Sequence, residues 1–134
     1  MIYKIFLIDG DNGISLLEAT FKEFGKGIEN FVLTGFFNAI NKTIDTLQAA
    51  MSKGRRVNEM TRVLESEDST VVIYYHPLSR VLFCSISDAD DDTEKIKEIL
   101  YKISKRFWVK HQDDLAMFRD TNEKLRFHSI FFYF

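Results

Sequence analysis

The chain has 134 residues and a formal net charge of −2. This length suits one domain with its own hydrophobic core, so we treat residues 1–134 as a single domain. The near balance of charge provides no field that would gather nucleic acid, and nucleic-acid binding is not expected. No apolar run approaches the roughly 20 residues that a membrane-spanning helix needs.

Cysteine usage indicates the compartment. Cys84 is the single cysteine and cannot form a disulfide within the chain. No basic segment followed by an apolar stretch and a small-residue cleavage site opens the sequence. These two features predict a cytoplasmic protein in a reducing environment.

The sequence opens with two apolar runs that are separated by a turn. Residues 2–8 are almost continuously apolar, which is typical of a strand buried on both faces, and residues 14–21 form a shorter, more polar run. Between them lies "DGDNG", in which Asp-Gly and Asn-Gly supply the positive φ angles of hairpin turns. The alternative, a calcium loop, fails because its twelfth position, a glutamate in such loops, is Thr20. The stretch therefore predicts a β-hairpin.

A long amphipathic helix follows from about Glu29. Its apolar residues recur at helical spacing, and they are Leu33, Phe36, Phe37, Ile40, Ile44, Leu47 and Met51. Asn30 is the predicted N-cap. Gly54 predicts the end of the helix.

Three closely spaced strands are predicted next, at 58–65, 70–76 and 80–87. The last two are nearly all apolar, whereas the first carries polar residues, which indicates an edge strand. Residues 92–108 return to a helical period, and a further helix is predicted from about Asp113. The order is ββαβββαα, with one long helix covering one face of an antiparallel sheet and two shorter helices covering the other.

This order resembles the longin domain, a profilin-like α/β/α sandwich of the SNARE-like superfamily. The resemblance covers nearly the whole chain and is strongest where the hairpin "MIYKIFLIDGDNGISLLEATF" precedes the helix "ENFVLTGFFNAINKTIDTLQ". A roadblock domain, by contrast, begins with a helix. The resemblance implies an α/β (α+β) fold whose five-stranded antiparallel sheet has the order 2-1-5-4-3.

The resemblance also implies a non-catalytic role, because longin domains bind small GTPases, SNARE helices or one another in trafficking complexes. The chain lacks a SNARE coiled coil, and it resembles the stand-alone longin modules found in archaea beside Ras-like GTPases. We therefore expect a protein partner, either a small Ras-like GTPase or a longin or roadblock domain, in a homodimer or a heterodimer.

Other motifs fail as sites of chemistry. The acidic run at 88–94 lacks the glycine and glutamate of a calcium loop and is explained by the dipole of the helix that follows. "FGKG" at 24–27 lacks the P-loop spacing. His76, His111 and His128 have no metal-ligand spacing. We expect no metal, no cofactor and no catalytic residue, and we interpret Cys84 as a core thiol.

The partner surface is predicted on the outward face of the long helix and on the adjacent edge strand. That face is uncharged near its start. The candidate residues are Thr34, Asn38, Asn41 and Asp45 on the helix and Glu59, Thr61 and Arg62 on the strand.

Three further interpretations remain open. Lys53, Arg55 and Arg56, with Arg62 nearby, form a cationic cluster that suits an acidic partner or anionic lipid, or else is solvated at the helix end. A small-molecule sensor is the alternative function, because profilin-like sandwiches hold ligands between sheet and helix. An enzyme is the third alternative, although no pair of titratable groups has a recognisable catalytic arrangement.

Overall fold

A computed structural model describes residues 1–25 and 27–121 of the chain. Five strands and two helices make up this part. In chain order they are β1 (Ile2–Asp9), β2 (Ser15–Thr20), α1 (Glu29–Ser52), β3 (Met60–Glu65), β4 (Thr70–His76), β5 (Val81–Ser87) and α2 (Thr93–Thr121).

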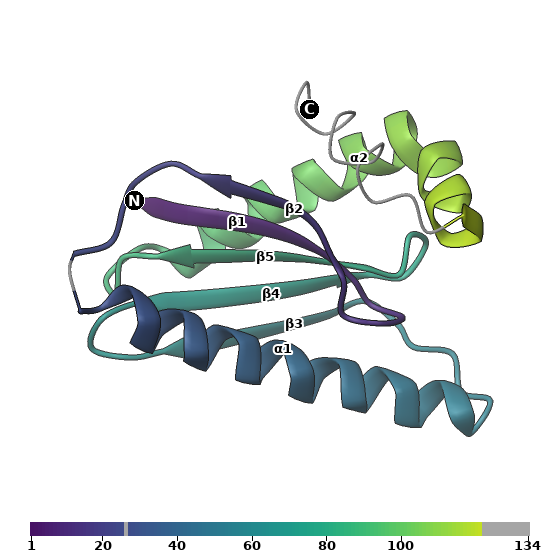
Figure 1. The fold of residues 1–134 in the computed structure, drawn as a ribbon, viewed down its shortest axis with the longest axis horizontal. Helices are drawn as coiled ribbons and strands as arrows, with labels where there is room; N and C mark the ends of the chain where they lie inside the picture. Colours follow the sequence, from purple (N-terminus) through teal and green to yellow (C-terminus); the bar gives the residue numbers. More distant parts are fainter. Residues whose placement is uncertain (26, 122–134) are drawn as a thin grey trace.

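The strands form one antiparallel sheet in the order β2-β1-β5-β4-β3. This confirms the predicted strand order, with β1, β5 and β4 in the centre and β2 and β3 at the edges. Helix α1 crosses one face of the sheet, and α2 lies on the opposite face (Figure 1).

The core consists of two layers, because successive side chains of a strand point to opposite faces. In β4, Ile73 and Tyr75 pack in the layer under α1, whereas Val72 and Tyr74 pack in the layer under α2. Cys84 is completely buried, in the α1 layer. Burial raises the pKa of its thiol, so the interpretation as a core thiol is confirmed.

The region predicted as two helices after the sheet forms one helix, α2, up to Thr121. The sequence pattern breaks at His111, which is polar. In the structure His111 is 7% exposed and lies between Phe107 and Leu115 on the buried side of the helix. A buried histidine thus continues the apolar stripe. Leu125, which we assigned to the final helix, lies outside the described residues.

The prediction for α1 is wrong at its N-terminus and confirmed at its C-terminus. The predicted N-cap, Asn30, is wrong: the helix begins at Glu29, and Ile28 occupies the cap position without a side-chain hydrogen bond. The predicted stop is confirmed. Gly54 has a φ of 71°, and its N–H donates to the carbonyl of Met51 while Arg55 N–H donates to that of Ala50. This is a Schellman motif, which requires a left-handed residue at Gly54.

Candidate protein-interaction surface

Strand β3 is an open edge of the sheet. It pairs with β4 in unbroken register from Met60–Tyr75 to Glu65–Thr70, and its other side has no strand beside it in the described part of the chain. Val63 and Leu64 are 38% and 43% exposed. A regular edge strand presents a row of backbone donors and acceptors, so β3 can accept a strand from a partner.

The opposite edge, β2, is protected. Its pairing with β1 shifts register between Leu7 and Ile8, and the ammonium of Lys4 lies 2.6 Å from the carboxylate of Glu18. A bulge at an edge opposes the addition of another strand, and the pairing of β3 has no such irregularity. The two edges therefore differ, and β3 is the one available for pairing.

The outward face of α1 carries the four helix residues that we predicted for the partner surface. Thr34, Asn38, Asn41 and Asp45 are all exposed, on the side of the helix away from the sheet. The hydroxyl of Thr34 donates to the carbonyl of Asn30 at 2.7 Å. The structure therefore brings these four residues together on one face.

The three predicted residues of the edge segment do not share one surface. Arg62 faces α1, where its guanidinium donates to the hydroxyls of Thr43 and Thr46 at 3.3 Å. Thr61 pairs with Tyr74 and so faces the α2 layer. Glu59 precedes β3, and its carboxylate accepts a 3.1 Å hydrogen bond from the Tyr74 hydroxyl. Arg62 thus fixes α1 to the edge strand, while Thr61 and Glu59 lie on the other side of the sheet.

A groove of about 240 Å³ separates the start of α1 from the end of β3. Phe31 and Gly35 line it from the helix and Leu64 from the strand. Phe31 is 71% exposed. The sequence reasoning missed Phe31 and Leu64. Two sequence features could have identified them. Phe31 is an aromatic residue outside the buried stripe of its helix, and Leu64 is an apolar residue on a strand that was predicted to lie at an edge.

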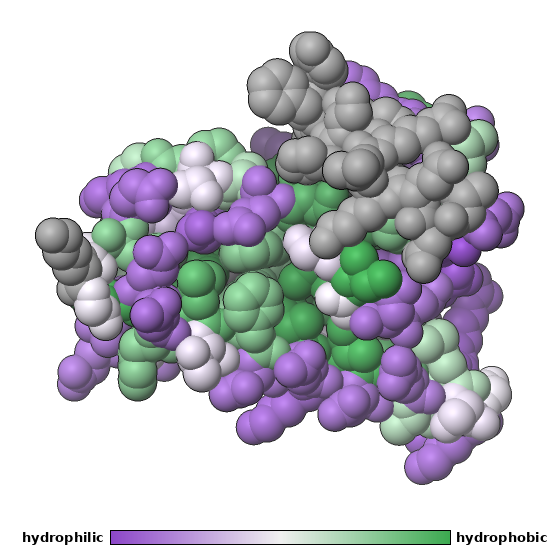
Figure 2. All heavy atoms as spheres, in the orientation of Figure 1, coloured by the Kyte–Doolittle hydropathy of each residue, from purple (hydrophilic) through white to green (hydrophobic). Residues whose placement is uncertain are grey.

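Hydrophobic residues also gather on the visible face between α1 and the β1–β2 hairpin, as Figure 2 shows. On α1, Phe37 is 44% exposed, and its ring lies 5.9 Å from that of Phe6. Phe37 and Met51 belong to the apolar stripe predicted for this helix, but Met51 is 38% exposed as well. Both lie at the margin of the helix stripe.

The "DGDNG" stretch forms the predicted hairpin turn. Asp9 N–H donates to the carbonyl of Ile14 at 2.9 Å, and Gly13, with a φ of 78°, donates to the carbonyl of Asp9 at 2.8 Å. The carboxylate of Asp9 caps the turn by accepting from the N–H of Asp11. The interpretation as a turn is confirmed.

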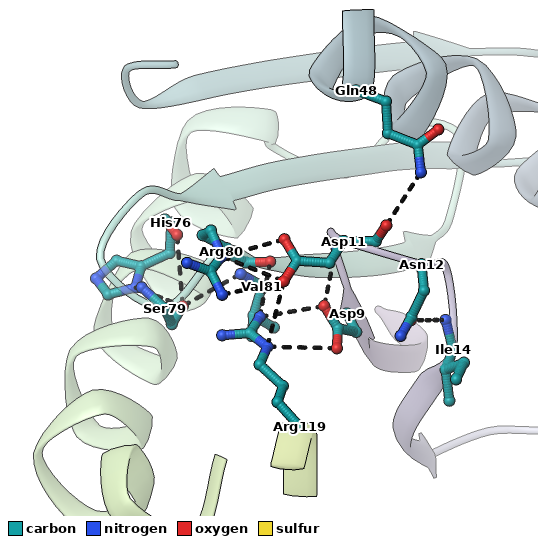
Figure 3. A network of polar contacts seen from close by, with 10 residues as sticks. All are labelled: Asp9, Asp11, Asn12, Ile14, Gln48, His76, Ser79, Arg80, Val81 and Arg119. Carbon is teal, nitrogen blue, oxygen red and sulfur yellow. Dashed lines mark hydrogen bonds and ion pairs between the residues drawn. The ribbon is translucent and has the colours of Figure 1, made fainter. Parts of the chain in front are cut away.

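The same turn holds a network of ion pairs that the sequence reasoning missed (Figure 3). Asp9 is completely buried, and the guanidinium of Arg119 at the end of α2 lies 3.1 Å from it. Asp11 pairs with Arg80 at 3.0 Å. The network joins the β1–β2 turn, the β4–β5 turn and α2.

The cationic cluster lies just beyond α1. Lys53, Arg55 and Arg56 are exposed. Arg62 is bound to α1 and is not part of an exposed cluster. The cluster therefore consists of three cations at the negative end of the helix dipole.

Two classes of site have no support in residues 1–25 and 27–121. No group of three or more His, Cys, Asp or Glu side chains there is arranged to hold a metal ion. Neither α1 nor α2 combines the length and the hydropathy that crossing a bilayer requires.

No family model matches the chain, and no curated protein matches it. The structure itself defines an α+β domain whose sheet has one protected and one open edge.

Proposed function

We propose that the chain is a non-catalytic protein-interaction module of the longin type. It binds a partner through the open edge of β3 and the outward face of α1. The observation that carries this proposal is the unbroken, unprotected edge of β3 beside the apolar groove formed by Phe31 and Leu64. Backbone pairing supplies affinity in such an arrangement, and the groove supplies a site for an anchoring side chain.

The partner in this proposal is a small Ras-like GTPase, a second longin or roadblock domain, or another copy of the chain. The resemblance to longin domains and the sheet order 2-1-5-4-3 support it. The exposed cations Lys53, Arg55 and Arg56 would then lie close to an acidic partner or to the anionic face of a membrane. We place the protein in the cytoplasm.

Retention of a GTPase tests the first partner. The chain is immobilised and incubated with purified Ras-like GTPases of the same organism, loaded with GDP, loaded with a non-hydrolysable GTP analogue, or free of nucleotide. We expect retention that depends on the nucleotide state. If no GTPase is retained in any state, the GTPase proposal is wrong.

Assembly with a second copy is tested by size-exclusion chromatography with light scattering. Leu64→Lys places a charge on the open edge, as natural edge strands do, and should abolish self-assembly or partner binding. Leu78→Lys is the matched control, because Leu78 is 65% exposed but lies in the β4–β5 turn. Equal effects of the two variants would contradict the assignment to β3.

A small-molecule sensor is the second candidate function, and a specific observation favours it. An open recess of about 400 Å³ lies between β4 and α2, on the face of the sheet opposite α1. Its volume is within the range of ligand sites. A thermal-shift screen in which no compound raises the melting temperature would count against this function.

A further inference from the structure

The recess between β4 and α2 has aromatic walls. Tyr74 and His76 line it from β4, and Tyr101 and Trp108 line it from α2. The Tyr74 and Tyr101 rings lie 6.1 Å apart, and the His76 and Trp108 rings 6.2 Å apart, both in edge-to-face contact. Aromatic rings prefer edge-to-face or offset neighbours. A planar ring that enters the recess can therefore make the same kind of contact with these side chains.

His76 offers the recess a hydrogen-bond donor. Ser79 contacts its Nδ1 twice, through the hydroxyl at 2.7 Å and the backbone N–H at 3.3 Å. Because the backbone N–H can only donate, Nδ1 is an acceptor and the ring proton resides on Nε2. The Ser79 contacts fix the ring from the side of the turn, and the other ring nitrogen points away from them (Figure 3).

This donor has no hydrogen-bond partner among the described residues. His76 is 8% exposed, and in the described part of the chain no hydrogen bond reaches its Nε2. Burial lowers the pKa of His76, so the neutral tautomer with a proton on Nε2 is the form at neutral pH. A donor that no protein group uses is available to a ligand that brings an acceptor atom.

The charges at the rim favour a negative group on that ligand. The ammonium of Lys105 lies 4.6 Å from the centre of the Tyr101 ring and is not within an ion pair in the described residues. Glu59 carries the opposite charge, and its carboxylate accepts a hydrogen bond from the hydroxyl of Tyr74. A ligand carboxylate is therefore drawn toward Lys105 and repelled by Glu59, which gives the recess a polarity.

We propose that this recess binds a small planar aromatic carboxylate, with its ring packed against the paired aromatic side chains that line it and its carboxylate at the His76 Nε2–H and Lys105. The inference names a ligand class for the sensor function and is independent of the interaction surface on β3. Its ring selectivity comes from the aromatic walls, and its charge selectivity comes from Lys105.

The chain carries its own reporter, because Trp108 is the single tryptophan and lines the recess. Benzoate is titrated while tryptophan emission is recorded with excitation at a wavelength that benzoate does not absorb. Cyclohexanecarboxylate provides the same charge without an aromatic ring, and benzamide provides the ring without the charge. We expect benzoate to saturate at about 1 to 10 mM, as befits so small a ligand, and to bind at least about tenfold more tightly than cyclohexanecarboxylate.

Substitutions at exposed residues then test the geometry without disturbing the core. Lys105→Gln should weaken the binding of benzoate by about fivefold or more and leave the binding of benzamide unchanged. Glu59→Gln should instead increase the affinity for benzoate. Lys102→Gln, one turn earlier on the same helix and outside the recess, is the matched control and should change neither.

Three results would overturn the assignment: no saturable change of emission with benzoate up to about 20 mM, which is beyond the expected range, equal binding of cyclohexanecarboxylate, or equal effects of Lys105→Gln and Lys102→Gln. Equal binding of the saturated acid would reject the aromatic class while leaving a ligand site in place. Loss of partner binding in Leu64→Lys is read in a separate assay, so failure here leaves the interaction proposal standing.

Discussion

The ion pair between Asp9 and Arg119 provides a sharp test of how the chain is held together. The Asp9 carboxylate is completely buried and Arg119 is 19% exposed, yet 110 positions separate them in the sequence. Replacing Arg119 by Met keeps an unbranched apolar side chain and removes the guanidinium with its charge. Asp9 then keeps only the backbone N–H of Asp11 among the donors that reach it in the described residues.

The magnitude follows from burial. Removing one partner of a buried ion pair costs about 3 to 5 kcal/mol, because the remaining charge is left without compensation. Arg119 retains some contact with solvent, so we expect a value at the lower end, about 3 kcal/mol. For a domain of this size that corresponds to a fall in melting temperature of about 9 to 15 °C.

The neighbouring pair of Asp11 and Arg80 is the control; Asp11 also lies 3.5 Å from the guanidinium of Arg119, so Arg119→Met removes this exposed contact as well. Asp11 and Arg80 are 32% and 48% exposed, and an exposed pair contributes about 0.2 to 1 kcal/mol. Urea denaturation of Arg119→Met, Asp11→Asn and the double variant Asp9→Asn with Arg119→Met gives the three free energies of unfolding. The double variant should recover part of the loss, because no charge remains buried. If Arg119→Met costs no more than Asp11→Asn, the reasoning from burial is wrong.

Three further predictions concern the backbone and pH. Gly54→Ala should lower the free energy of unfolding by about 1 to 2 kcal/mol because Gly54 has a φ of 71°, whereas Gly35→Ala, inside α1 with open space around an added Cβ, should raise it by about 0.5 to 1 kcal/mol; urea denaturation measures both. Burial lowers the pKa of His76 in the folded state, so stability should fall as pH drops below about 6.5, and denaturation of His76→Phe between pH 7 and 5 should lack that slope. Hydrogen bonds from Tyr3 and the amino terminus lower the pKa of Asp88, so its contribution is present above about pH 4 and lost below it; melting curves of Asp88→Asn should vary less with pH in that acid range.

The sheet was predictable because the residues of each strand indicate whether that strand is central or at an edge. Strands buried on both faces are almost continuously apolar, as in Thr70–His76 and Val81–Ser87, while Met60–Glu65 contains several polar residues and lies at an edge. The turn at residues 9–13 was predictable for the same reason, since Asp-Gly and Asn-Gly specify their own backbone geometry. Local rules failed at His111, where a polar residue is buried within a helix.

The contacts that build the surfaces were not predictable, because they join residues far apart in the sequence. The sequence around Asp9 does not indicate an ion pair with Arg119. The sequence of α2 likewise does not indicate that Tyr101 and Trp108 line the same recess as Tyr74. The side of the sheet on which an edge residue lies depends on the strand register, and for this reason the predicted position of Glu59 was wrong. It was grouped with the helix face from sequence but lies on the opposite side of the sheet.

Register also links the two proposed surfaces. Neighbouring positions of β3 alternate between the layers, so Leu64 faces the groove beside α1 while Thr61 faces the recess side. The segment leading into β3 belongs to the recess through Glu59, whose carboxylate holds the hydroxyl of Tyr74. An anionic ligand that repels Glu59 weakens this contact at the point where the open edge begins. If both proposals hold, a ligand in the recess and a partner on β3 would act on one continuous segment from opposite faces of the sheet, and this segment would be the physical route by which the ligand changes the affinity for the partner.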